Sequence, residues 1–223
     1  MISSFLIPFD AFERNKKVAS FLKDGESVLD VGGGITGIKF FTNNTVKTLD
    51  VVESDIKVGP GELPFPKGSW DVVTCVDVLE HIPPKDRKKF IEDLYEVASK
   101  RVIIAAPYGS KPHEEAEKKL SAEIKKKGKS VAFLEEHIKN GLPTSEEANP
   151  KGGGNVFYSG DFRFSNCLFR FQIYESGQLV VDKLLLILKG LINLLANLFL
   201  YPFWFYKKAS EYSNRFYIVI DKP

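Results

Sequence analysis

A glycine-rich segment flanked by acidic residues is the part of the sequence best suited to bind a small molecule. In VLDVGGGITG, Asp30 precedes Gly32 and Gly34, and glycines at these places let the backbone turn tightly and approach a ligand. Asp50 stands where an acidic side chain would bind the hydroxyl pair of a ribose. Dinucleotide-binding sites have no acidic residue just before their glycines, because a negatively charged pyrophosphate binds there. The carboxylate of Asp30 therefore favours a ligand with an ammonium group, such as a methionine moiety.

The elements around this segment alternate between strands and helices. Near-continuous apolar runs such as WDVVTCV predict strands covered on both faces of a parallel sheet, and helical periodicity predicts helices between them. The predicted strands are 27–31, 46–52, 70–76, 101–106 and 215–220, and the predicted helices include 9–23 and 83–99. The predicted fold class is α/β, a Rossmann-like, doubly wound and mostly parallel sheet that binds ligands at the carboxyl ends of its strands.

Four motifs, in this order and spacing, resemble those of class I S-adenosylmethionine-dependent methyltransferases of type 11. They are VLDVGGGITG, LDVVESD, ELPFPKGSWDVV and DVLEHIPP, within residues 20–108. The resemblance implies S-adenosylmethionine as the cofactor. The residues that it implies are Asp30, Gly32 and Gly34 at the methionine end, Asp50 at the ribose, Gly61 and Glu62 near the adenine, and Val76 and Asp77 beside the cofactor. Two features depart from the family pattern: the third glycine is displaced to Gly37, beyond Ile35-Thr36, and Pro60 lies where an adenine-binding aspartate is often found.

Methyl transfer from a sulfonium requires alignment of the acceptor and, for a hydroxyl acceptor, removal of a proton. His81 follows the strand at 70–76 and lies at the predicted edge of the cofactor pocket, so it is the candidate base. The alternative is that His81 packs or caps at the start of the helix 83–99. Both interpretations stay open on the sequence.

Asp77, Glu80 and His81 form a D-x-x-E-H pattern whose spacing would put three ligands on one face of a helical turn. It resembles the E-x-x-E-H metal site of small-RNA 2′-O-methyltransferases, with His113 or His137 needed as a further ligand, and such a site would suit Mg²⁺ or Mn²⁺. Two solvated acids beside a capping histidine are the favoured interpretation, so no metal is expected.

The chain divides into three regions by composition: a cofactor-binding core at 1–110, a helical lid or linker at 111–150, and an aromatic segment at 151–223. In the middle region, 112–127 predicts a charged, solvated helix, 133–143 predicts a second helix, and TSEE at 144–147 has the spacing of a capping box. A flexible joint is expected at KGGGN, from Lys151 to Asn155.

The last region carries nine basic and five acidic residues, a net charge of +4, and 16 of the 28 aromatic residues. Its segment 184–206 is long enough to span a membrane, but Lys189, Asn193, Asn197 and Tyr201 form one polar stripe along a predicted helix. The stripe favours a helix lying in a membrane interface or against the core, with Trp204, Phe205 and Lys207-Lys208 suited to anchor it within 184–208. A lid helix or a dimer face explains the pattern equally well.

These observations predict a methyltransferase that acts on a hydroxyl of a glycan, a lipid-linked intermediate or another small molecule. The pattern EHIKNGLP, followed by a Leu-rich helical stretch and a terminal strand, further resembles methyltransferases associated with surface-glycan biosynthesis. The net charge of +2 does not favour nucleic acid as a partner, and two cysteines are too few for a disulfide framework. We expect a cytoplasmic protein, peripheral to the inner face of the membrane. The alternatives are a nicotinamide-dependent oxidoreductase, for which the Tyr-x-x-x-Lys pair is missing from 71–130, and a catalytically silent module docked on a membrane.

Overall fold

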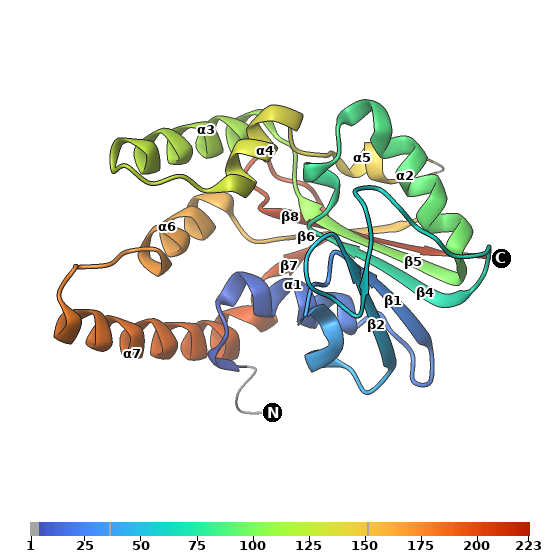
Figure 1. Cartoon of the computed structure of the whole chain (residues 1–223), viewed down its shortest axis with the longest axis horizontal. Helices are drawn as coiled ribbons and strands as arrows, with labels where there is room; N and C mark the ends of the chain where they lie inside the picture. The colour runs from blue at the N-terminus through green and yellow to red at the C-terminus, as the bar shows by residue number, and fades with distance from the viewer. Residues whose placement is uncertain (1–4, 36, 151) are drawn as a thin grey trace.

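The computed structural model describes residues 5–35, 37–150 and 152–223, so Thr36 and Lys151 of the loops discussed above lie outside the described residues. Within this part of the chain, one twisted sheet carries helices on both faces (Figure 1). Two apolar cores lie on opposite sides of the sheet.

The sheet confirms the predicted fold class. Over the described residues its strands are β1 (Ser27–Val31), β2 (Thr45–Asp50), β3 (Ile56–Lys57), β4 (Trp70–Val76), β5 (Ala98–Pro107), β6 (Asn155–Ser159), β7 (Phe205–Tyr206) and β8 (Arg215–Asp221). They lie side by side in the order β3-β2-β1-β4-β5-β8-β6-β7. Strands β1 to β5 pair in parallel, and β8 runs antiparallel to both β5 and β6. The strands β3, β6 and β7 were not predicted.

The central strand β4 is apolar on both of its faces, and each face packs against a different core. Val73 lies opposite Leu29 of β1 and Val102 of β5. Because alternate side chains of a strand point to opposite faces, Val73 belongs to one apolar core and Val72 to the other. The apolar run therefore serves two cores, as the sequence predicted.

The helices cover the two faces and the carboxyl ends of the strands. They are α1 (Phe9–Ala19), η2 (Gly37–Phe41), η3 (Leu79–His81), α2 (Pro84–Val97), α3 (Lys111–Lys126), α4 (Ala132–Asn140), α5 (Ser145–Ala148), α6 (Phe162–Gln172), α7 (Leu179–Leu195), η4 (Ala196–Leu200) and η5 (Tyr201–Phe203). Helix α4 contacts η3, the turn directly after β4, and α3 contacts both α4 and α6. These three helices lie beyond the end of the sheet (Figure 1) and enclose the space where ligands of such sheets bind.

Two predicted helices differ from the observed ones for local reasons. Helix α1 ends at Ala19 rather than near residue 23, because the amides of Phe21 and Leu22 bond three residues back, to Val18 O and Ala19 O, at 3.1 Å each. The helix predicted at 112–127 is not merely a solvated surface. In α3 the side chains of His113 and Glu117 are buried, and they face the space above the sheet. Half of the capping box is present: the Thr144 hydroxyl accepts the Glu147 amide at 3.1 Å, while the Glu147 carboxylate binds Arg87 at 3.1 Å.

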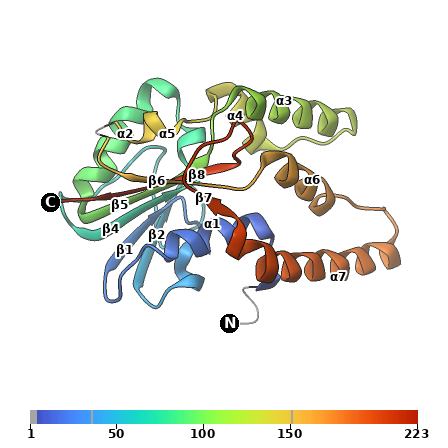
Figure 2. The same ribbon diagram turned by 180° about the vertical axis from the view of Figure 1, so that it is seen from behind.

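Helix α7 is turned with its polar side inward. Asn193 Oδ1 accepts hydrogen bonds from the Phe9 amide at 3.3 Å and from Gln172 Nε2 at 2.9 Å. Asn197 Nδ2 donates to Phe5 O at 2.8 Å and to Ile7 O at 3.0 Å. The predicted polar stripe therefore holds α7 and its continuation η4 to the body, while most of their leucines are exposed. Helix α7 runs along the edge of the molecule (Figure 2).

Two aromatic residues predicted to be interfacial anchors are half-buried against the body of the protein. The ring centroid of Trp204 lies 5.0 Å from that of Phe9 and 5.4 Å from that of Phe164. The ring centroid of Phe205 lies 5.9 Å from that of Tyr217 in β8. The turn η5 and the short strand β7 bring both side chains back toward the sheet, so each has only part of its surface left for contact with a membrane.

Candidate active site

The glycine turn after β1 lies at the carboxyl edge of the sheet, where a ligand was predicted to bind. Gly32 has φ 82° and Gly34 has φ 54°, in the region that favours glycine. A Cβ atom on Gly32 would overlap the side chain of Val78. The turn therefore needs glycine at position 32 for two independent reasons.

Asp30 does not face the ligand space. Its side chain is buried, with Oδ2 accepting the Ile38 amide at 3.0 Å and Oδ1 accepting the Thr74 hydroxyl at 2.7 Å. A Cβ atom on Gly33 would overlap this carboxylate. Burial raises the pKa of Asp30 to about 6, although the hydrogen bonds from Ile38 and Thr74 lower it. In this structure the carboxyl group holds the glycine turn to β4 and η2, which corrects the expected direct contact with an ammonium group.

Asp50, at the end of β2, meets the glycine turn. Its Oδ2 accepts the Gly34 amide at 3.0 Å, and its Oδ1 accepts the Val51 amide at 2.7 Å. The side chain is half-buried. The structure thus brings Gly34 and Asp50 together, with a carboxylate at the mouth of the turn.

The segment with Gly61 and Glu62 follows β3 on the outer side of Asp50. The Val58 amide donates to Asp50 O at 3.0 Å, which ties the segment to the end of β2. Gly61 has φ 76°, and the Glu62 carboxylate accepts the Gly59 amide at 2.9 Å. Both residues are exposed. Glu62 therefore closes its own turn, and Gly61 supplies the bend.

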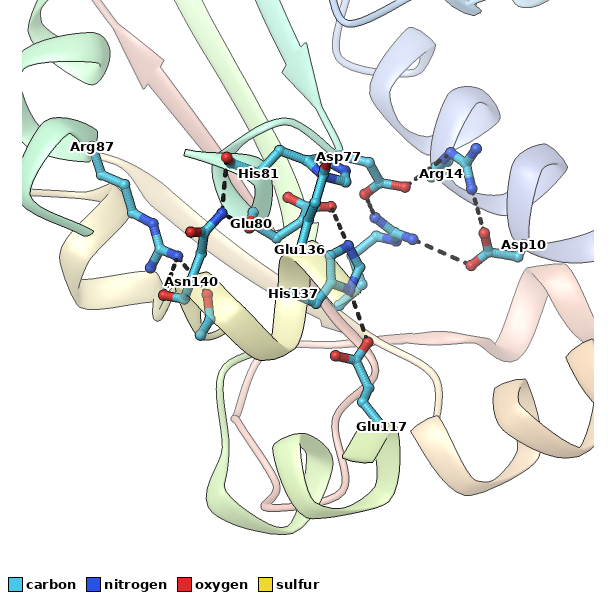
Figure 3. Close-up of polar contacts among 12 residues, drawn as sticks. Asp10, Arg14, Asp77, Glu80, His81, Arg87, Glu117, Glu136, His137 and Asn140 are labelled. Carbon is cyan, nitrogen blue, oxygen red and sulfur yellow. Dashed lines mark hydrogen bonds and ion pairs between the residues drawn. The ribbon is translucent and has the colours of Figure 1, made fainter. Parts of the chain in front are cut away.

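Val76 and Asp77 end β4 beside the glycine turn. Val76 is buried, and Asp77 is the only non-glycine residue with positive φ, at 53°, in the described part of the chain. The Asp77 carboxylate binds Arg14 Nε at 3.2 Å and also the guanidinium of Arg215. These contacts correct the predicted ligand pattern, because Asp77 neither belongs to a helical turn with Glu80 nor points toward it (Figure 3).

An arginine cluster, which the sequence did not reveal, joins α1, β4 and β8. Asp10 binds Arg14 and also Arg215, the latter at 3.2 Å. Arg215 is buried and extends toward Glu13 at 3.7 Å. The cluster forms one wall of the ligand space and closes the side of the sheet that α1 covers.

His81 is held by a carboxylate on its Nδ1 side. Glu136 of α4 lies 2.5 Å from His81 Nδ1, and the imidazole is half-buried. Burial lowers the pKa of His81 below 6.5, even though Glu136 acts to raise it. The imidazole is therefore neutral at pH 7 and has Nε2 left to accept a proton.

Two buried residues lie next to His81: the acid Glu80 and a second imidazole, His137. Glu80 is 1% exposed, and burial raises its pKa to about 8. His137 of α4 contacts Glu117 through Nδ1 at 3.0 Å and lies 3.9 Å from Glu80 through Nε2. Figure 3 shows Glu80, His81 and His137 gathered between η3 and α4. Of the two histidines that the sequence offered as further partners of Glu80 and His81, His137 is the one that joins them.

The turn that carries Glu80 and His81 is fixed to α4. Asn140 Nδ2 donates to His81 O at 2.9 Å, and Arg87 donates to Asn140 O at 3.0 Å and to Ile82 O at 3.0 Å. These bonds cross from the first region of the chain to the second, so α4 positions the histidines rather than serving as a loose linker.

These side chains surround a cavity of about 520 Å³ between η3 and the helices α1, α3, α4 and α6. Its lining includes the acidic, basic and histidine side chains Asp10, Arg14, Asp77, Glu80, His81, His113, Glu117, His137 and Arg215. A larger hollow of about 640 Å³ lies at the opposite edge of the sheet, lined by residues such as Tyr95, Ser99 and Lys222. We assign the site to the smaller cavity, because it lies at the carboxyl ends of the strands and contains the predicted residues Asp77, Glu80 and His81.

Comparison with known proteins agrees with this geometry. Residues 19–106 match the methyltransferase domain family. No curated protein sequence matches the chain. The family match covers β1, β4 and most of β5, and therefore the glycine turn, Asp50 and the η3 turn with His81.

Solved structures with the same fold include methyltransferases of low sequence identity. A Haemonchus contortus phosphoethanolamine N-methyltransferase 2, in complex with S-adenosylmethionine, is 17% identical with a TM-score of 0.55, over 100% of this chain and 56% of that one. The same protein, in complex with phosphomonomethylethanolamine and S-adenosylhomocysteine, is 17% identical with a TM-score of 0.51, over 94% of this chain and 52% of that one. A Thermotoga maritima S-adenosylmethionine-dependent methyltransferase is 12% identical with a TM-score of 0.56, over 99% of this chain and 92% of that one.

The chain spans about half the length of the two H. contortus chains. At these identities the likeness shows the fold, which is the Rossmann-like fold of class I methyltransferases. The domain match supports a methyltransferase that uses S-adenosylmethionine, and it does not favour the oxidoreductase or the silent binding module.

Proposed function

We propose that this chain is an S-adenosylmethionine-dependent methyltransferase that acts on a hydroxyl group of an acceptor bound in the 520 Å³ cavity. The observation that carries the proposal is the contact between the glycine turn and Asp50 at the carboxyl edge of the sheet. The match of residues 19–106 to a methyltransferase domain supports it.

In this proposal the residues at the ends of β1, β2 and β4 would hold the cofactor. Gly32 and Gly34 let the backbone approach its methionine end, and Asp50 accepts hydrogen bonds from the ribose hydroxyls. Asp30 fixes the glycine turn through its hydrogen bonds with Ile38 and Thr74, without touching the cofactor. Gly61 and Glu62 lie on the adenine side, next to Asp50 through Val58. Val76 and Asp77 would lie beside the cofactor, and Asp77 also lines the acceptor cavity.

The reaction needs alignment and one proton acceptor. S-adenosylmethionine, when bound, would supply the methyl group for the acceptor oxygen and would leave as the neutral thioether S-adenosylhomocysteine. The hydroxyl proton passes to His81, which lines the cavity and is oriented by Glu136 at 2.5 Å. A carboxylate behind a histidine fixes the tautomer and stabilises the imidazolium that forms. No metal ion is required for these steps.

The acceptor class follows from the cavity and from α7. We propose a glycan or a lipid-linked hydroxyl compound, because charged and polar side chains interrupt a largely apolar cavity wall and the adjoining helix exposes apolar residues. The direct test is transfer of a labelled methyl group from S-adenosylmethionine to components of a membrane extract. Labelling that His81→Ala abolishes supports the proposal, whereas labelling of protein or nucleic acid alone contradicts the acceptor class.

Helix α7 supports contact with a membrane surface. Leu179–Phe203 is long and apolar enough to span a membrane, with a mean hydropathy of 2.0 in its most apolar window, of which 17% is buried. A soluble domain rarely leaves such a surface uncovered. The stripe of Asn193 and Asn197 is bonded to the body, so the helix lies along the protein with one apolar side free. That geometry favours an interfacial helix, because a helix within a bilayer would have to release these bonds.

The charges next to the helix favour an anionic lipid surface over a second copy of the chain. Lys183, Lys207 and Lys208 are exposed at its two ends, and each basic residue near an anionic surface contributes about 1 kcal/mol. A symmetric dimer through this face would bring the same lysines together. We therefore propose a cytoplasmic protein that binds peripherally to the inner face of the membrane through 179–208.

Sedimentation with anionic vesicles tests this surface. Phe199 and Phe203 are 65% and 88% exposed, so Phe199→Ser with Phe203→Ser should release the protein from the vesicles without changing its melting temperature. Val51→Ser with Val52→Ser is the matched control, because both valines are exposed but lie at the end of β2. Equal sedimentation of both variants, or a concentration-dependent dimer that ignores vesicles, contradicts the membrane assignment.

A further inference from the structure

Glu80, His81 and His137 turn toward one another in the cavity, although they come from two separate elements, η3 and α4. One ligand atom of each lies within 4.8 Å of those of the other two, and Glu80 Oε1 and His137 Nε2 are 3.9 Å apart. Around a tetrahedral ion with bonds of about 2.1 Å, ligand atoms lie about 3.4 Å apart. A small closure of these side chains would therefore surround one ion.

A carboxylate stands behind each imidazole of this cluster. Glu136 contacts His81 Nδ1 at 2.5 Å, and Glu117 contacts His137 Nδ1 at 3.0 Å. A histidine whose Nδ1–H donates to a carboxylate presents the lone pair of Nε2, which is the arrangement found behind metal-bound histidines. Two separate carboxylates, from α4 and α3, thus select the same tautomer in two neighbouring histidines.

Two polar atoms at the centre of the cluster have no hydrogen-bond partner among the described residues. They are Glu80 Oε2 and His137 Nε2, on side chains that are 1% and 5% exposed. Buried polar atoms are normally paired, and an unpaired one calls for an explanation such as an ion. A cation between Glu80 and His137 would bind both atoms.

We infer that Glu80, His81 and His137 bind one divalent transition-metal ion, with a fourth coordination position open to the cavity. Two imidazoles and one carboxylate suit Zn²⁺ better than Mg²⁺, which prefers oxygen ligands. The site differs from the predicted Asp77, Glu80 and His81 set, because Asp77 is bound to Arg14 and Arg215.

The effect of the ion on catalysis rests on the proposed function. In that reaction His81 Nε2 takes the proton of the acceptor, and a bound ion occupies the same nitrogen. Zn²⁺ therefore inhibits methyl transfer, and a chelator leaves the rate of the metal-free enzyme unchanged.

The binding experiment is a calorimetric titration of Zn²⁺ into chelator-treated protein. Cys167 is exposed and would bind Zn²⁺ itself, so every variant carries Cys167→Ser. The expected stoichiometry is one ion per chain, and His137→Gln should weaken binding at least about 100-fold, since even the residues behind metal ligands change affinity by about 10–100-fold. Glu80→Gln should weaken it as well, and it keeps the shape of the side chain.

The matched control is His113→Gln, which alters a buried histidine of the same cavity that contacts Tyr108 O at 2.9 Å and lies outside the cluster. Its Zn²⁺ affinity should match that of the parent protein. Melting curves without metal identify any variant that fails to fold, in which case the other cluster variant decides. Absence of stoichiometric binding, or an affinity that neither cluster variant changes, overturns the site. Binding of S-adenosylhomocysteine, measured separately, tests the proposed function and does not depend on this ion.

Discussion

The buried carboxyl group of Asp30 makes the stability of the fold depend on pH in a calculable way. Its pKa is raised from 3.8 to about 6 by burial, so the native state favours the protonated form. A raised pKa contributes stability that is fully present below the unfolded value and is lost as pH rises through the native value. The difference of about 2 pKa units, at 1.36 kcal/mol each, amounts to about 3 kcal/mol. We expect this loss in the free energy of unfolding between about pH 4 and pH 7.

Asp30→Asn isolates this effect from the other groups that titrate in the same range. The amide oxygen can accept the Ile38 amide, and the amide nitrogen can donate to Thr74, whose hydroxyl lies 3.4 Å from Leu29 O. The variant therefore keeps the hydrogen bonds and removes the charge. Urea denaturation of both proteins at several pH values gives the difference between their unfolding free energies. This difference should shift by about 3 kcal/mol in favour of Asn as pH rises from about 4 to 7.5. Parallel curves for the two proteins would refute the reasoning.

Two further variants test the glycine turn and the His81–Glu136 pair, called the dyad below. Gly32→Ala should lower the free energy of unfolding by at least about 2 kcal/mol, because a Cβ meets Val78 at φ 82°. Gly25→Ala, at φ 80° with nothing within 4 Å of its Cβ, should cost only about 1 kcal/mol, and equal losses in urea denaturation would contradict the overlap. Glu136→Ala should lower turnover by about ten- to a hundredfold with little change in cofactor affinity, because His81 loses the group that orients it. Glu135→Ala, on the same helix but bonded to Ser121 and Lys125, is its control in a kinetic assay, and similar losses in both variants would argue against the dyad.

The strands of the core could be predicted from the sequence because their signals are local. The apolar runs at β1 and β4 set the same bounds as the observed strands, and a strand buried on both faces needs no polar pattern. Strand β6 was missed because it is short and follows a glycine run. Its pairing with β8, some sixty residues later, decides its conformation.

The candidate site could be predicted only where it depends on local sequence. The glycine turn and Asp50 lie at the same edge of the sheet and contact each other, because they follow the adjacent parallel strands β1 and β2. The direction of the Asp30 side chain depends on Thr74, a residue of another strand. The positive φ of Asp77 removes the helical spacing that the ligand pattern assumed. The partners of His81 and His137 come from α3 and α4, whose packing no local pattern reveals.

Calorimetric binding of S-adenosylhomocysteine tests the central claim most directly. The account predicts one site per chain, with Asp50→Asn weakening binding by about ten- to a hundredfold through lost charge-assisted hydrogen bonds to the ribose, worth about 1.5–3 kcal/mol. The same variant can still accept the Gly34 amide through its side-chain oxygen, but it gives up the bond from the Val51 amide, so melting curves of both proteins check that the fold is kept. No binding of the nucleoside, binding of NAD in its place, or an affinity that Asp50→Asn leaves unchanged would contradict the account.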